Sequence, residues 1–161
     1  TTSLFESLTV GECLRLARSY HVRPSKLEQA DRIALPQASH RVLESTGLIE
    51  RLDERVHNLP HGMKRALELA MVLALEPSVL LLDEPTAGLT KQDRQLVGSI
   101  LTDLRRELGM AIMLIEHDLD FVKEICTRLV VLHRGQLVLD GSVDDVVNSE
   151  VVQEIYSGGH T

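Results

Sequence analysis

One stretch near the middle of the chain, residues 79–86, limits the folds that this sequence can adopt. Four large apolar residues, Val79-Leu80-Leu81-Leu82, are followed at once by Asp83, Glu84 and Pro85. Such a run fits a strand covered on both faces better than an alternating surface strand. Successive side chains of a strand point oppositely, so one carboxylate can face a metal while the other faces a water. We expect a buried strand that places the carboxylates of Asp83 and Glu84 at a functional site. The alternative is that these residues are only a solvent-exposed strand end, terminated by Pro85.

The spacing of apolar residues predicts helices and strands in alternation after residue 61. A second apolar run ends in Glu116-His117-Asp118, and the loop His133-Arg134-Gly135 is typical of a hairpin. Alternation of this kind argues for an α/β core with a largely parallel sheet. The expected elements are helices at 62–75, 90–108, 119–125, 143–147 and 151–156, and strands at 79–82, 110–115, 129–132 and 136–139.

The first 58 residues contain no β run and are expected to form a helical subdomain. Thr9 and Glu12 have the spacing of a capping box, and a helix resumes at Ala38–Ser45. His21–Pro36 mixes proline and polar residues and is expected to be a loop. With the amphipathic helix added, we predict two parts, residues 1–76 and 77–161.

Composition is that of an ordinary soluble globular protein and weakens the case for a nucleic-acid role. The chain has 161 residues, and 43% of them are apolar. Its formal net charge of -7 does not indicate the basic surface that nucleic-acid-binding proteins usually have. No stretch has the length and apolarity of a membrane span, and two distant cysteines are typical of a reducing compartment. We expect a cytoplasmic protein that does not bind nucleic acid.

Four features follow one another in a fixed order: a helix start at 59–63, the acid-tipped strand, a glycine turn at 87–90, and a strand that ends at His117. In this order they resemble the ATP-binding cassette of ABC transporters, and the likeness covers essentially the whole chain. The resemblance implies the C-terminal part of a RecA-like P-loop NTPase core, a mostly parallel sheet with a C-terminal hairpin, joined to an α-helical subdomain. ATP and Mg²⁺ are the implied cofactors.

The resemblance also implies roles for three side chains. Asp83 resembles the Walker B aspartate that holds Mg²⁺, and Glu84 resembles the carboxylate that polarises the attacking water. His117 resembles the switch histidine near the γ-phosphate. A zinc site made by Glu116, His117 and Asp118 is the rival interpretation, disfavoured because neighbouring side chains at a strand end diverge.

Residues 59–63 occupy the place of the signature Leu-Ser-Gly-Gly-Gln, which meets ATP held by the opposite subunit. Leu59 and Gly62 match, whereas Pro60, His61 and Met63 depart from it. A histidine at the third signature position is similar to branched-chain amino acid and urea importers.

The turn made by Gly88, Leu89 and Thr90 resembles the D-loop, although Thr90 stands where many members have aspartate. These three residues and residues 59–63 are therefore expected to contact nucleotide.

No Gly-x-x-x-x-Gly-Lys-Ser/Thr motif occurs in the sequence, so no loop is available to cradle the β-phosphate. Thr2–Val10 resembles the segment just after the Q-loop, and we expect a cassette truncated there that does not hydrolyse ATP alone. The family's P-loop strand would lie between the strands at 110–115 and 129–132.

The parent protein is expected to power an importer of amino acids or of urea and amides from the inner face of the membrane. Its implied partners are a second ATPase subunit, transmembrane permease subunits and, indirectly, a substrate-binding protein. Two alternatives remain: a non-catalytic interaction module, and a soluble ABC ATPase that does not act in transport.

Overall fold

The computed structural model describes residues 5–19 and 35–156. Contacts within the chain group it into a first unit that ends at Ile115 and a second unit that begins at Glu116. The predicted division between residues 76 and 77 separates a helical subdomain from the rest of the chain, whereas these two units are groups of residues in contact. That division stays a prediction. Most of the predicted loop His21–Pro36 lies outside the described residues.

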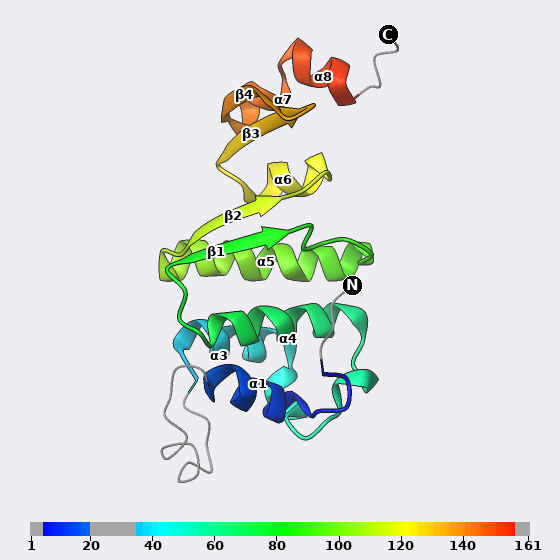
Figure 1. Ribbon diagram of the computed structural model, residues 1–161, viewed down its shortest axis with the longest axis vertical. Coiled ribbons are helices and arrows are strands. Elements are labelled where there is room, and N and C mark those ends of the chain that lie inside the picture. Colours follow the sequence, from blue (N-terminus) through cyan, green and yellow to red (C-terminus); the bar gives the residue numbers. More distant parts are fainter. Residues whose placement is uncertain (1–4, 20–34, 157–161) are drawn as a thin grey trace. The chain divides into compact units, whose positions relative to one another are not determined.

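Helices make up the first part of the first unit (Figure 1). The predicted capping box is confirmed, because the amide of Glu12 donates to Thr9 Oγ1 and the amide of Thr9 donates to Glu12 Oε2. Because the Glu12 carboxylate accepts this backbone hydrogen bond, its pKa is lowered. The elements are α1 (Val10–Ser19), α3 (Gln37–Thr46), the 3₁₀ turns η1 (Leu48–Arg51) and η2 (Val56–Asn58), and α4 (His61–Leu73).

Helix α4 is the centre of this helical layer and contacts α1, α3 and α5 (Lys91–Leu108). Its apolar residues recur at three- and four-residue steps, and the residues on that stripe are buried. The hydroxyl of Ser39, fully buried on α3, donates to the carbonyl oxygen of Ala70 on α4 at 2.8 Å. Arg18 of α1 donates to the carbonyl oxygen of Ala74 just beyond α4. These bonds satisfy buried polar groups and fix the helices side by side.

Strands β1 (Val79–Asp83) and β2 (Ala111–Ile115) pair in parallel, as predicted, with Val79 opposite Ala111 and Asp83 opposite Ile115. Figure 1 shows both strands running along α5. Leu80 is 2% exposed, whereas Leu81 is 71% exposed. The prediction of a strand covered on both faces is therefore wrong for the described residues, because α5 covers one face only.

Helix α5 begins and ends where the sequence predicts. The side chain of Thr90 accepts a hydrogen bond from the amide of Asp93, which caps the first turn. The helix ends at Gly109, whose amide bonds back to the carbonyl oxygen of Leu104.

Over its described residues, 116–156, the second unit holds a hairpin and three short helices. The predicted hairpin is confirmed: β3 and β4 pair antiparallel, and Arg128 makes two hydrogen bonds to Asp140 at 2.8 and 2.9 Å. Its small core is formed by Val131, Val146 and Val152. The elements are α6 (Leu119–Ile125), β3 (Arg128–His133), β4 (Gln136–Ser142), α7 (Val143–Val147) and α8 (Glu150–Tyr156).

Among the described strands, β1 and β2 form one sheet and β3 and β4 form another. Within the same residues, no helix combines the length and apolarity needed to cross a membrane. The predicted α/β class with a parallel pair and a C-terminal hairpin is confirmed.

Candidate functional site

Asp83 and Glu84 lie at the carboxyl end of β1, and both are exposed. Glu84 has a φ of 44°, a left-handed conformation that is uncommon for a residue with a side chain. The backbone therefore turns between the two carboxylates instead of continuing the strand. Strain of this kind is often found where a side chain must take a particular direction at a functional site.

The chain after Glu84 folds into two successive turns. The amide of Ala87 donates to the carbonyl oxygen of Glu84 at 3.1 Å, and the amide of Leu89 donates to that of Thr86 at the same distance. Thr86 is 5% exposed, which anchors the turns to the protein interior. Gly88 has a φ of 73°, which a glycine adopts without strain. The predicted glycine turn, including Leu89 and Thr90, is thus a defined connection between β1 and α5.

The signature-like residues 59–63 form the start of α4. Leu59 is buried, and Pro60 is the N-cap, with no hydrogen bond from its side chain to the helix. The first turn's amides have no partner within a helix, and the carbonyl oxygen of Pro60 accepts from Lys64 at 3.0 Å. His61 is exposed at the first helical position. This helix end can favour an anion through its amides and its dipole.

Asp93 joins this helix start to the glycine turn. Its carboxylate accepts a hydrogen bond from Thr90 Oγ1 at 2.8 Å, and it also faces Gly62, so closely that a Cβ there would lie 2.6 Å from Asp93 Cγ. The structure therefore links Gly62 of the signature-like segment to Thr90 of the glycine turn through the side chain of Asp93. From the sequence, Asp93 belongs only to the start of the helix predicted at 90–108, because the Thr-x-x-Asp spacing contains no signal of a contact with α4.

A cavity of about 140 Å³ lies beside Asp83 in the first unit. Arg65 and Glu68 of α4 form an ion pair at 2.8 Å on its wall. Pockets that hold a drug-sized ligand have volumes of about 300–1,000 Å³, so this cavity is too small for a nucleotide. Sequence reasoning missed it, and the only available signal was the i, i+3 charge pair on α4. The other lining residues are Leu69, Val72, Leu82, Pro85 and Val97.

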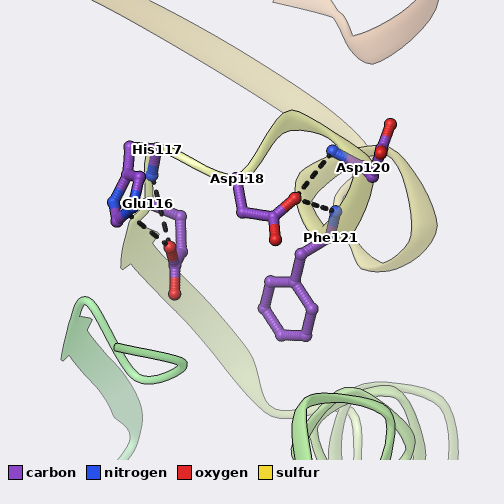
Figure 2. A network of polar contacts seen from close by, with 5 residues as sticks. All are labelled: Glu116, His117, Asp118, Asp120 and Phe121. Atoms are coloured by element: carbon purple, nitrogen blue, oxygen red, sulfur yellow. Dashed lines mark hydrogen bonds and ion pairs between the residues drawn. The ribbon is translucent and has the colours of Figure 1, made fainter. Parts of the chain in front are cut away.

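His117 belongs to the second unit, and its predicted role beside a phosphate stays a prediction (Figure 2). Its backbone amide donates to Glu116 Oε2 at 3.2 Å, and its side chain is 73% exposed. Asp118 caps α6 by accepting hydrogen bonds from the amides of Asp120 and Phe121. In the described part of the chain no group of three histidine, cysteine or carboxylate side chains has the arrangement of a metal site, so the zinc interpretation gains no support.

Asp83 offers a donor suited to Mg²⁺. The ion is held in nucleotide sites by one or two carboxylates, with substrate phosphates and waters as the other ligands. An exposed carboxylate at a strand end, with a second exposed carboxylate next in sequence, fits such a site without a protein cage.

Solved structures identify the class of fold. The chain matches the ADP conformation of MJ1267, an ATP-binding cassette of an ABC transporter, with a TM-score of 0.78 and 24% identity over 98% of this chain and 66% of that one. It matches CbiO1 from Clostridium perfringens, part of the transporter complex CbiONQ, with a TM-score of 0.72 and 28% identity over 94% of this chain and 58% of that one. The fold is that of ABC cassettes, which confirms the predicted P-loop NTPase class.

The sequence model of the ABC transporter family matches residues 1–87, more than half of the chain. The chain therefore belongs to the ABC transporter family. The methionine import ATP-binding protein MetN of Histophilus somni is 36% identical over 126 residues, which are 78% of this chain and 36% of MetN. The branched-chain amino acid transport ATP-binding protein LivG of Salmonella typhimurium is 31% identical over 163 residues, 96% of this chain and 64% of LivG. The chain thus spans between about a third and two thirds of these relatives.

Proposed function

We propose that this chain is part of the ATP-hydrolysing subunit of an ABC importer for amino acids or for urea and amides. The observation that carries the proposal is the turn at the end of β1, where Glu84 in a left-handed conformation follows Asp83. The relatives named above support the amino acid class, because they are ATP-binding proteins of methionine and branched-chain amino acid transport.

In this proposal each candidate residue has a separate task. Asp83 would hold Mg²⁺, which when bound supplies positive charge against the phosphate oxygens. Glu84 would orient the attacking water and accept its hydrogen bond, from the position where a φ of 44° turns the backbone out of the strand. His117 would contact the γ-phosphate.

Two backbone segments would complete the contacts with nucleotide. The backbone amides of the first turn of α4, from His61 onward, would face the phosphate of an ATP bound by a second ATPase subunit, within the signature-like residues 59–63. The turn of Gly88, Leu89 and Thr90 would hold that helix start in place through α5. Permease subunits would receive the resulting movement on the inner face of the membrane, with a substrate-binding protein acting from the other side.

The test is a chimera in which this chain replaces the matching segment of LivG, assembled with the LivG partner subunits. We expect Mg²⁺-dependent phosphate release and uptake of a branched-chain amino acid. Glu84→Gln should reduce phosphate release by about 10²-fold or more while ATP still binds. A chimera whose phosphate release is unaffected by Glu84→Gln would exclude Glu84 from this role.

We expect that this chain alone neither binds ATP tightly nor hydrolyses it. Calorimetry of the chain with Mg·ATP tests this expectation. Micromolar binding would show that the missing Gly-Lys-Ser/Thr loop is not essential.

A non-catalytic interaction module is a second candidate, favoured by one observation. Pro60 at the N-cap supplies no side-chain hydrogen bond to α4, where a serine would supply one. This candidate predicts that the chimera assembles with the permease subunits but releases no phosphate.

A further inference from the structure

Asp93 lies between the starts of two helices and touches both. Its Oδ2 accepts a hydrogen bond from Thr90 Oγ1 at 2.8 Å, while Oδ1 is the atom closest to the Cβ position of Gly62. A Cβ at residue 62 would also lie 2.6 Å from Cγ and 3.0 Å from Cβ of Asp93. Real Cβ atoms essentially never approach so closely, so any side chain at residue 62 requires the side chain of Asp93 to move.

The side chain of Asp93 is held in position by Thr90, the N-cap of its own helix α5. The hydroxyl of Thr90 accepts from the amide of Asp93 at 3.2 Å and donates to the Asp93 carboxylate, so both of its hydrogen-bonding functions are used. An aspartate at residue 90 could accept from the amide but could not donate to the carboxylate, and two like charges would then adjoin. The threonine at the D-loop position is therefore matched to Asp93.

We propose that Asp93 is a positioning residue that holds the first turn of α4 against the first turn of α5. Through it, the signature-like residues 59–63 and the turn 88–90 move as one body. Its negative charge also lies near the positive end of α4, which is a favourable place for a carboxylate. The effect of this positioning role on ATP hydrolysis rests on the proposed function. The steric contact between Asp93 and residue 62 does not depend on it.

The competing explanation is that Gly62 is glycine only so that a phosphate can approach the backbone. In that case a methyl group at residue 62 would not disturb the free protein. Alanine ordinarily stabilises a helix relative to glycine, so the two explanations predict opposite signs for Gly62→Ala.

The experiment is a double-mutant cycle on the printed chain, with stability measured by urea unfolding. We expect Gly62→Ala to lower the folding equilibrium constant about tenfold beside Asp93. In the Asp93→Ala background the same change should leave the constant unchanged or raise it. Asp93→Asn is the matched control, because it keeps the size of the side chain, and Gly62→Ala should remain destabilising there. Additive effects of Gly62→Ala and Asp93→Ala would overturn the proposal.

A second arm uses the LivG chimera and separates positioning from stability. Asp93→Ala should lower kcat for phosphate release about tenfold while KM for ATP changes less than about twofold, because the helix start acts on the phosphate after binding. Asp93→Asn should retain most of kcat. An unchanged kcat in Asp93→Ala would overturn the positioning role. If the parent chimera releases no phosphate, the proposed function fails on its own, and the stability cycle decides whether Asp93 holds the two helices together.

Discussion

The amide of Glu84 donates a hydrogen bond to the carbonyl oxygen of Ile115, with 2.9 Å between the nitrogen and the oxygen. The bond continues the parallel pairing of β1 and β2 by one residue beyond Asp83. Glu84 is thus held by the sheet on its amide side while its φ of 44° turns the chain away from the strand. The direction in which the side chain of Glu84 leaves the backbone is therefore set by this turn at the end of the sheet.

The left-handed backbone at Glu84 predicts an unusual response to glycine. An L-residue in this conformation is disfavoured by about 1 kcal/mol or more, so Glu84→Gly should leave the free energy of unfolding unchanged or raise it by up to about 1 kcal/mol. Glu84→Val should lower it by about 1 kcal/mol, because a β-branched residue fits this region poorly. Urea unfolding of the printed chain measures both changes.

The control for that measurement is Gln95→Gly at an exposed position inside α5. There glycine has no conformational advantage and should cost about 0.5–1 kcal/mol. If Glu84→Gly and Gln95→Gly cost the same, the backbone at Glu84 is not left-handed in solution.

Two neighbouring leucines of β1 should respond differently to truncation. Leu80→Ala removes a buried side chain and should lower the free energy of unfolding by about 2–5 kcal/mol. Leu81→Ala removes an exposed side chain and should cost less than about 0.5 kcal/mol. Each variant is the control for the other, because both positions are leucines in the same strand. Chemical denaturation of this chain measures the free energy of unfolding of both variants. Equal losses would show that both faces of β1 are covered in solution.

The same strand shows what sequence could and could not predict. A run of four large apolar residues predicts a strand, its length and its acidic end, and all three agree with β1. The run does not reveal which face is covered, since Leu80 and Leu81 are chemically identical and differ only in their burial by the rest of the fold. The helix caps at Thr9 and Thr90 were predictable for the opposite reason, because they depend on residues only three positions apart.

Two features of the candidate site carry no signal in the local sequence. Glutamate is not a residue type associated with positive φ, so the turn at Glu84 follows from the pairing of β1 with β2 and the burial of Thr86. The approach of Asp93 to Gly62 joins residues 31 positions apart and depends on how α4 packs on α5. Motif resemblance located the residues, whereas their mutual arrangement required the packed helices.

Acid should weaken the hairpin of the second unit through one ion pair. Hydrogen bonds from Arg128 lower the pKa of Asp140 below its ordinary value of 3.8 and raise the pKa of Arg128. Because the folded-state pKa of Asp140 is the lower one, its contribution to stability is full above pH 3.8 and is lost as the pH falls through that folded value. NMR titration of the Asp140 carboxyl should give a pKa under 3.8, and Arg128→Gln should raise it. A pKa of Asp140 that is the same in both proteins would contradict the pairing.

The N-cap of α4 gives the last prediction. Pro60 supplies no side-chain acceptor to the first turn, whereas a serine at that position would accept from a free amide. Pro60→Ser should therefore be more stable than Pro60→Ala by about 1 kcal/mol, and this comparison cancels the loss of proline's rigidity, which both variants share. Urea unfolding of the two variants measures the difference. Equal stabilities of the two variants would show that this helix start accepts no side-chain cap. In the LivG chimera, faster phosphate release by Pro60→Ser than by Pro60→Ala would show that the capping hydroxyl also promotes turnover.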